Sequence, residues 1–289
     1  MAVILITGAS TGIGLATAVT LGRAGHDVQA TMRNPAGSPE LADIAAKEEL
    51  NITVHAMDVD DDASVKNGVA QILTLRGRID VLVNNAGVGM MGPIEEAPLA
   101  EFRQVMETNF FGALRCIQAV LPGMRERKGG CIVNVTIVAG RMAIAPQGAY
   151  ASSKWALEAL SEILAQEVKG FGIRVAIVEP GVIATPIFGK AKLTPAETQY
   201  PHTKRIAAIF TASLQNPTSA YVVGEKIREI VENGSWQLRY PTGPDAEPLL
   251  AKRAAMTDEQ WVETQGNRDD AEWAARFEKT FGFNPFAAK

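Results

Sequence analysis

Short apolar runs alternate with longer amphipathic stretches along most of the chain. The apolar runs predict strands at residues 3–6, 28–32, 52–57, 81–83, 131–136, 173–178 and 236–239. The stretches between them have helical periodicity near residues 13–24, 40–49, 62–76, 98–125, 147–169 and 218–233. Strands that read as continuous apolar runs suit a parallel sheet buried on both faces. The alternation therefore predicts an α/β fold, a doubly wound parallel sheet of the Rossmann type.

Two segments interrupt this rhythm. Residues 186–218 are rich in Pro, Thr and Lys and predict an insertion without a strand, which either covers a substrate or simply packs on the sheet. Its candidate covering residues are Ile187, Phe188, Leu193, Tyr200 and Phe210. Residues 241–289 predict a helical C-terminal extension, in which 257–260 form a capping box and Trp273 and Phe277 share a helix face. Neither segment is long enough for a second domain, so residues 1–289 are expected to form a single domain.

The composition excludes several classes of function. With 47% hydrophobic and 21% charged residues and a net charge of -4, the chain lacks the basic footprint of a nucleic-acid partner. No apolar run approaches the roughly 20 residues of a membrane span, and the N-terminus does not read as a signal peptide. Cys116 and Cys131 do not form a CxxC pair, which favours free thiols in the cytoplasm. The scattered histidines His26, His55 and His202 predict no metal site.

A glycine-rich turn joins the first predicted strand to the first predicted helix. Residues 7–14 read Thr-Gly-Ala-Ser-Thr-Gly-Ile-Gly. Glycines let the backbone turn sharply and approach a pyrophosphate, and a helix N-terminus offers free N–H groups to phosphates. A tight turn without a ligand is the alternative. The predicted phosphate-binding residues are Gly8, Ser10, Thr11, Gly12, Ile13 and Gly14.

The end of the second predicted strand bears on the choice of nucleotide. An NAD site places an acidic residue here for the ribose 2′-hydroxyl, whereas an NADP site needs a cation for the 2′-phosphate. This chain has Met32 followed by Arg33, with no carboxylate. Arg33 could be an ordinary solvated side chain, but the missing acid favours NADP(H) as the cofactor.

Tyr150 and Lys154 form a candidate acid/base pair. On a helix, residues four apart lie on one face. A phenol with an ordinary pKa of about 10 is a poor acid/base group at neutral pH, and a nearby ammonium favours its ionised form. The pair therefore predicts proton donation to a carbonyl, or acceptance from an alcohol.

Taken in order, these motifs resemble the short-chain dehydrogenase/reductase family, and within it the steroid-, retinol- and carbonyl-reductase-like members. The resemblance covers residues 1–190 closely, and it rests on the glycine turn, an Asn-Asn-Ala-Gly at 84–87 and the Tyr-x-x-x-Lys at 150–154. It implies that the adenine is held at Asp58 and Val59. Further cofactor contacts are implied at Asn85, Ala86, Gly87, Tyr150, Lys154, Pro180, Gly181, Ile183 and Thr185.

The resemblance also implies roles for residues outside the nucleotide site. Lys154 would bind the nicotinamide ribose, and Asn109 would join the catalytic residues by holding a water of the proton path. The implied assembly is a homodimer or homotetramer built through the helices at 98–125 and 147–169.

One position departs from the family pattern. The family has a catalytic serine thirteen residues before the tyrosine, and here that position is Ile137. Thr136 would replace the serine only if the backbone were rotated, because adjacent strand residues face opposite sides. Losing one donor to a developing oxyanion costs about 10²–10³ in turnover. Two hypotheses follow: an NADP(H)-dependent oxidoreductase that interconverts a carbonyl and an alcohol on a medium-sized apolar substrate, or a catalytically impaired NADP(H)-binding sensor or scaffold.

Overall fold

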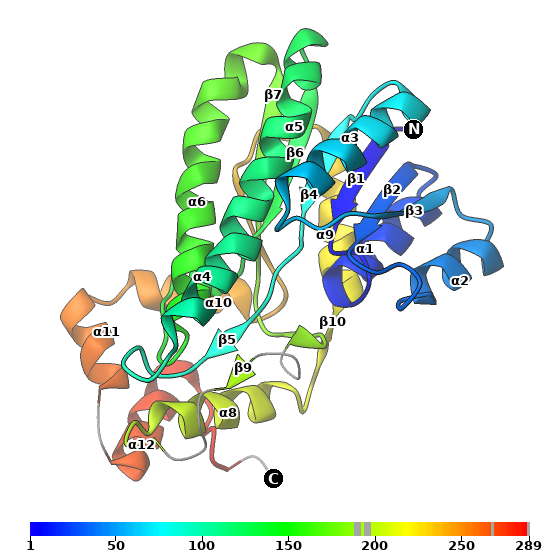
Figure 1. Ribbon diagram of the computed structural model, residues 1–289. Coiled ribbons are helices and arrows are strands. Elements are labelled where there is room, and N and C mark those ends of the chain that lie inside the picture. Colours follow the sequence, from blue (N-terminus) through cyan, green and yellow to red (C-terminus); the bar gives the residue numbers. More distant parts are fainter. Residues whose placement is uncertain (188–191, 194–197, 267–268, 288–289) are drawn as a thin grey trace.

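A parallel sheet lies at the centre of the computed structural model, which describes residues 1–187, 192–193, 198–266 and 269–287 (Figure 1). In this part of the chain the sheet has seven strands, in the order β11-β7-β6-β4-β1-β2-β3. The strands are β1 (Val3–Thr7), β2 (Asp27–Met32), β3 (Ile52–Ala56), β4 (Val81–Asn84), β6 (Gly130–Val135), β7 (Ile173–Pro180) and β11 (Arg239–Thr242). Every pairing is parallel. The predicted doubly wound fold is therefore confirmed, although the last strand begins three residues later than expected.

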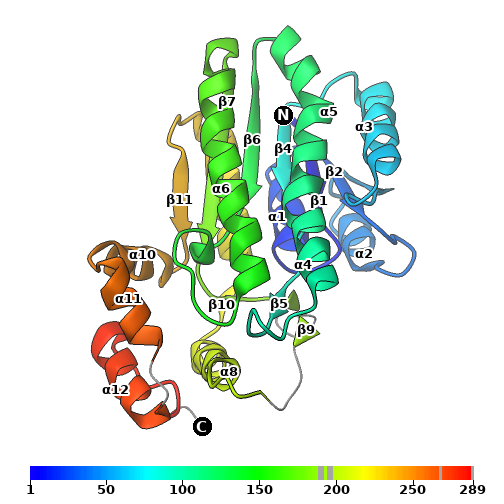
Figure 2. The same ribbon diagram turned by 60° about the vertical axis from the view of Figure 1, so that its left-hand side comes forward.

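Helices cover both faces of the sheet. One face carries α1 (Gly12–Arg23), α2 (Glu40–Lys47) and α9 (Ala220–Asn233), and the other carries α3 (Asp62–Arg76), α5 (Gly112–Glu126) and α6 (Gly148–Val168) (Figure 2). Alternate residues of β1 enter the two cores: Ile4 packs with the first set of helices and Leu5 with the second. This is the two-residue period of a strand buried on both sides. Among the helices described, none is long and apolar enough to cross a membrane.

The helix expected at 98–125 is not continuous. It begins as α4 (Leu99–Met106), passes through a π-helical turn at Glu107–Phe111 and continues as α5. Single π-helical turns are rare and often lie at functional sites. The turn contains the predicted site residue Asn109, so the interruption lies where the resemblance expects chemistry.

Very short strands were missed in the sequence. β5 (Met90–Met91) pairs with β9 (Lys192–Leu193), and β8 (Ile183–Ala184) pairs with β10 (Thr218–Ser219). The prediction that residues 186–218 contain no strand is therefore wrong. Two-residue pairings are too short to leave a periodic pattern, and they depend on which segments the fold brings together. The same region also contains the helix α8 (His202–Ser213).

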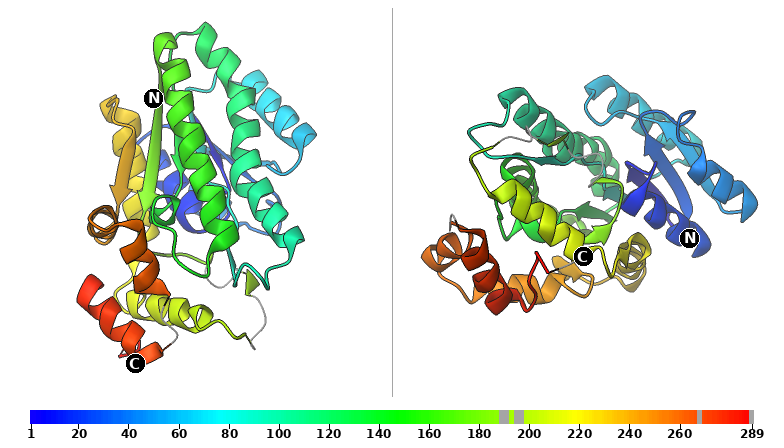
Figure 3. Two further views of the ribbon diagram at one scale, coloured as in Figure 1. Left: turned by 90° about the vertical axis from the view of Figure 1, so that its left-hand side faces the viewer. Right: turned by 90° about the horizontal axis from the view of Figure 1, so that it is seen from below.

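The C-terminal extension is helical, as predicted. It contains α10 (Ala246–Ala254), α11 (Asp258–Gln265) and α12 (Asp270–Phe281). The expected capping box opens α11 at Thr257. Trp273 and Phe277 are buried together against Ile206 and Ile209 of α8. These helices pack with α8 at the carboxyl end of the sheet (Figure 3). They are therefore placed to form one wall of a ligand site at that end.

The order of the strands reverses at β1: β2 and β3 lie on one side of it, and β4, β6, β7 and β11 lie on the other. In open α/β sheets, ligands bind beyond the carboxyl ends of the strands at such a switch point. The segments that follow β1 and β4 meet there, and they carry the glycine turn and the residues 84–87.

Candidate active site

A cavity of about 260 Å³ lies at this switch point and runs from the glycine turn to α6. We call it the glycine-loop cavity. The predicted residues that line it are Gly8, Ser10, Thr11, Gly12, Ile13, Arg33, Asp58, Val59, Asn85, Ala86, Gly87, Tyr150, Lys154, Pro180, Gly181, Ile183 and Thr185. Segments far apart in the sequence thus meet in one cavity. Two of the predicted site residues, Gly14 and Asn109, are not part of its lining.

Glycine is required in the turn for two different reasons. Gly8 and Gly12 have φ of +68° and +60°, a conformation that side chains disfavour, and a Cβ on Gly8 would lie 2.6 Å from the Cα of Ala86. Gly14 instead permits close packing, because a Cβ there would lie 2.3 Å from the carbonyl oxygen of Gly8 and 2.4 Å from Nδ2 of Asn85. This compact turn leaves the N-terminus of α1 open to the cavity and fits the phosphates of a dinucleotide.

Arg33 lies at the edge of the glycine-loop cavity. Its side chain is exposed, and it forms no ion pair with any residue that the structure describes. Met32 beside it also lines the cavity, so the end of β2 contributes no acidic side chain there. A guanidinium in this place is available for an anionic group of a ligand.

Tyr150 and Lys154 both lie on α6 and both line the cavity. Nζ of Lys154 donates to the carbonyl of Val135 at 2.9 Å and lies 5.8 Å from the centre of the Tyr150 ring. Burial lowers the pKa of Lys154 to about 8 and raises the pKa of Tyr150 above its ordinary value. The expectation that the ammonium favours the phenolate is therefore wrong for this structure, because burial alone sets the direction in which the pKa of Tyr150 moves. At neutral pH Tyr150 is a phenol and can donate a proton.

Asn109 is buried behind the cavity wall. Its Oδ1 accepts from the N–H of Val88 at 2.8 Å, while Nδ2 donates to the carbonyl of Val88 at 3.0 Å and to Oγ of Ser153 at 2.9 Å. The amide thus ties the segment after β4 to α6. Its side chain positions the cavity wall, and all of its hydrogen-bonding groups are engaged in doing so.

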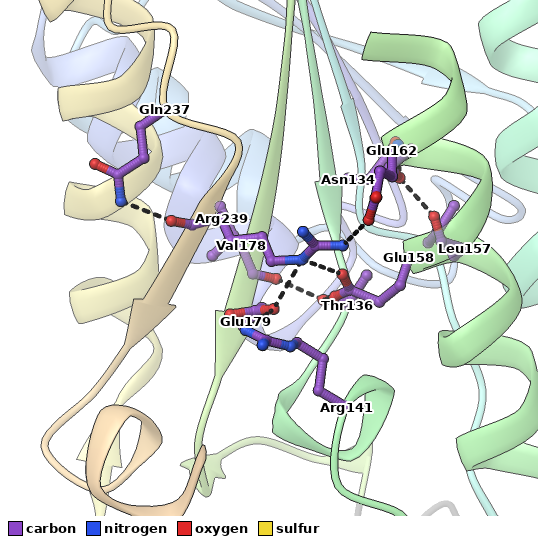
Figure 4. A network of polar contacts seen from close by, with 11 residues as sticks. Asn134, Thr136, Arg141, Leu157, Glu158, Glu162, Val178, Glu179, Gln237 and Arg239 are labelled. Atoms are coloured by element: carbon purple, nitrogen blue, oxygen red, sulfur yellow. Dashed lines mark hydrogen bonds and ion pairs between the residues drawn. The ribbon is translucent and has the colours of Figure 1, made fainter. Parts of the chain in front are cut away.

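Ile137 and Thr136 differ in what they offer to the cavity. Both residues line it, Ile137 with an apolar side chain. The hydroxyl of Thr136 lies 2.7 Å from Oε1 of Glu158 and 3.1 Å from the carbonyl of Val178, within a network of polar contacts (Figure 4). Because that hydroxyl is already engaged, Thr136 does not take the place of the missing serine.

The same network surrounds a second buried carboxylate, Glu179 of β7. Nε of Arg239 lies 3.1 Å from Oε2 of Glu158 and 3.7 Å from Oε1 of Glu179, and Arg141 approaches Glu179 to 3.6 Å (Figure 4). Burial raises the pKa of both carboxyls, that of Glu179 to about 7, with the charge of Glu158 adding to the effect. Glu158 lies one helical turn after Lys154, so this network supports the base of the cavity.

A second cavity of about 150 Å³ adjoins the first and is mostly apolar. We call it the apolar cavity. Tyr150 and Ile137 line both cavities. Its other apolar lining includes Met90, Met91, Val138, Met142, Ile144, Ile187, Ile206, Ile209, Phe210, Leu249, Phe277, Phe281 and Phe283. The α8 region and the C-terminal helices thus supply much of its wall.

The residues predicted to cover a substrate lie in different places in the structure. Ile187 and Phe210 line the apolar cavity. Tyr200 lies outside its lining, and its hydroxyl donates to Glu95. Phe188 and the side chain of Leu193 lie outside the described residues.

Comparisons with known proteins agree with this geometry. A family model described as short chain dehydrogenase matches residues 2–196. The chain belongs to the short-chain dehydrogenase family. Retinol dehydrogenase 8 from Homo sapiens is 40% identical over 238 residues, which cover 79% of this chain and 75% of that protein. These matches confirm an oxidoreductase family member similar to the retinol dehydrogenases.

Solved structures of the short-chain dehydrogenase family share the fold. A short-chain dehydrogenase from Streptomyces avermitilis matches with a TM-score of 0.81 and 34% identity, covering 92% of this chain and 96% of that one. An alcohol dehydrogenase from the archaeon Thermococcus sibiricus, complexed with 5-hydroxy-NADP, matches with a TM-score of 0.70 and 25% identity, covering 83% and 95%. Nucleotide binding is therefore supported by structural relatives as well as by the cavity.

Sequence reasoning missed several lining residues. Val88, Gly89 and Thr108 line the glycine-loop cavity, and Gln147 lines the apolar cavity. For Gln147 a signal was available: it precedes Tyr150 by three residues, so an α-helix at this point places both on one side. The other three lie on connections and in the π-helical turn, where no periodicity indicates which way a residue faces.

Proposed function

We propose that this protein is an NADP(H)-dependent oxidoreductase that interconverts a carbonyl and an alcohol on a medium-sized apolar substrate. The observation that carries the proposal is that Tyr150 lines both the glycine-loop cavity and the apolar cavity. A nucleotide in the first and an apolar molecule in the second would meet at the phenol. The similarity to retinol dehydrogenase 8, whose name specifies an apolar alcohol, supports this substrate class.

The residues divide the chemistry between binding and proton transfer. When bound, the cofactor supplies the hydride. Tyr150, which is a phenol at neutral pH, donates the proton to the substrate oxygen. Lys154, with a charged Nζ in the glycine-loop cavity, binds the ribose of the cofactor. Asn109 positions the segment at Val88 through its amide.

The preference for NADP(H) rests on Arg33. Its exposed guanidinium at the cavity edge has no acidic neighbour on the strand end and suits a 2′-phosphate. Dissociation constants for NADPH and NADH, measured by fluorescence titration, test this preference. We expect Arg33→Ala to weaken NADPH binding by at least about tenfold and to leave NADH binding nearly unchanged. Tighter binding of NADH than of NADPH by the native protein would contradict it.

Ile137 supports the competing function, an NADP(H)-binding sensor or scaffold with an impaired site. The two functions are separated by NADPH consumption with a panel of apolar ketones and aldehydes. The oxidoreductase predicts turnover of at least one carbonyl at an ordinary rate, on the order of 1–10³ per second. Binding of NADPH without any turnover would favour the sensor.

We further propose a cytoplasmic homo-oligomer. Apolar side chains exposed on and beside α6 support an interface between copies: Phe111, Trp155 and Ile163 are 42%, 49% and 54% exposed. Cys116 and Cys131 are both free and buried, in keeping with a reducing compartment. Light scattering coupled to size-exclusion chromatography tests the assembly, and a monomer at micromolar concentration would contradict it.

A further inference from the structure

The apolar cavity contains few polar side chains. Those in its described lining are Gln147, Tyr150, Ser213 and Asp245. Asp245 is an acceptor that holds the N–H of Val182 at 2.8 Å. Besides the phenol, the hydrogen-bond donors are therefore Gln147 and Ser213. Of these, Gln147 lies one helical turn from Tyr150, whereas Ser213 is at the end of α8.

The side chain of Gln147 has no hydrogen-bond partner among the residues that the structure describes. Its backbone is engaged, since its N–H donates to Ile144 at 3.1 Å and its carbonyl accepts from Ala151 at 2.8 Å. The residue is only 6% exposed, yet its carboxamide makes no hydrogen bond with any part of the chain that the structure describes. Its amide atoms are not fully enclosed by protein, so they can be reached from the cavity that the residue lines. Such a group in a cavity wall points to a ligand as its partner.

The position of Gln147 relative to Ile137 indicates which ligand atom the amide of Gln147 binds. Both residues line the apolar cavity together with Tyr150. A substrate carbonyl must lie beside Tyr150 to receive its proton. Ile137 offers no donor there, and the hydroxyl of Thr136 is held by Glu158. A carbonyl oxygen beside Tyr150 would otherwise receive a single hydrogen bond from the side chains of the cavity.

We propose that Gln147 is a catalytic residue whose Nε2 donates a hydrogen bond to the substrate carbonyl oxygen, replacing the serine that the family has at position 137. The inference rests on the proposed function and deepens it. In the reduction, a hydride supplied by NADPH, which would become NADP⁺, forms a bond to the carbonyl carbon while the electron pair of the C=O π bond moves to oxygen. That oxygen takes the proton of Tyr150, whose O–H bond breaks and leaves the phenolate. Gln147 loses no proton; it stabilises the negative charge that develops on oxygen.

The direct test is Gln147→Leu, which removes the donor and keeps a similar volume. We expect kcat for carbonyl reduction to fall by about 10²–10³. The dissociation constant for NADPH should stay the same, since Gln147 is absent from the lining of the glycine-loop cavity. The matched control is Gln166→Leu on α6, whose exposed amide donates to the carbonyl of Glu162, and it should leave both quantities unchanged.

A rescue experiment separates catalysis from structural damage. Introducing Ile137→Ser into the Gln147→Leu protein should restore at least about tenfold in kcat, because a donor returns to the same oxygen. In the native background, Ile137→Ser should raise kcat much less. If Gln147→Leu unfolds, Gln147→Met provides the same test with another shape, because it also lacks a donor.

Several outcomes would overturn the inference. Retention of kcat within about threefold in folded Gln147→Leu, or a rise in KM alone, would remove Gln147 from the transition state. A larger loss in Ser213→Ala than in Gln147→Leu would assign the donor to Ser213. In these cases the native protein still reduces carbonyls, so only this inference fails. A native protein that reduces no carbonyl would instead refute the proposed function, and this inference with it.

Discussion

Glu179→Gln should make the protein more stable above neutral pH and should change little near pH 5. Glu179 is completely buried, and neither of its carboxylate oxygens makes a hydrogen bond within the part of the chain that the structure describes. Arg141 and Arg239 approach only to 3.6 Å and 3.7 Å, and Glu158 adds a second negative charge. Ionising this carboxyl therefore opposes folding.

The pKa of Glu179 gives the sign and size of the effect. Burial raises the pKa from 4.5 to about 7, so between these values the folded protein binds the proton and the unfolded chain does not. The stability contributed by this proton is complete below pH 4.5, falls as the pH rises, and is lost above about pH 7. A difference of this size corresponds to about 3 kcal/mol. Glutamine has no proton to lose, so the variant should escape this part of the decline.

Thermal unfolding measured between about pH 5 and pH 8 tests the reasoning. The Tm of Glu179→Gln relative to the native protein should rise across this range by several degrees, since about 1 kcal/mol shifts Tm by about 2–4 °C in a chain somewhat smaller than this one. The control is Glu162→Gln: Glu162 also pairs with Arg239, but it is exposed and its pKa is lowered, so it stays ionised throughout. Parallel Tm curves for native protein and Glu179→Gln would refute the burial argument.

Other substitutions test the site. Gly14→Ala should cost about 1–3 kcal/mol in denaturant unfolding, because its Cβ would lie 2.3 Å from the oxygen of Gly8, and it should weaken NADPH binding in a fluorescence titration; unchanged binding would contradict the packing role. Tyr150→Phe should lower kcat by about 10²–10⁴ while NADPH still binds, and full activity would exclude Tyr150 as the donor. In a pH–rate profile, kcat/KM for reduction should fall as the pH rises through about 8, where Lys154 loses its charge; a flat profile to pH 10 would contradict this. Trp273→Ala should cost about 3–5 kcal/mol in denaturant unfolding, and a cost below about 1 kcal/mol would show that the C-terminal helices are held by other contacts.

How far the sequence could predict this molecule depends on the range of the interactions. The main strands and helices were predictable, because continuous apolar runs and helical periodicity are local signals that burial in a parallel sheet enforces. The capping box at Thr257 was predictable because it, too, is a signal carried by neighbouring residues in the sequence. The pairing of Met90 with Lys192 was not, since each side contributes two residues and neither carries a pattern. The π-helical turn around Asn109 was not predictable either, and the partners of Asn109, Val88 and Ser153, lie in other segments.

The active site shows the same division between local and distant causes. The motifs gave the residues of the glycine-loop cavity, because each occupies a fixed place on a strand end or helix face. They gave the wrong direction for the pKa of Tyr150, since counting charges on α6 does not include desolvation by the segments packed over it. Sequence spacing revealed that Ile137 removes a hydroxyl, and it left open whether Thr136 replaces it.

The structure answers that question by showing what each neighbouring donor already binds. The hydroxyl of Thr136 is engaged by Glu158, and the amide of Asn109 is engaged by Val88 and Ser153. The amide of Gln147 has no such partner among the described residues, and it lies in the wall that Ile137 shares with Tyr150. A missing serine is therefore weak evidence for a disabled enzyme in this fold. The developing charge needs a donor at one point in space, and the residue that precedes α6 can supply it as well as one after β6.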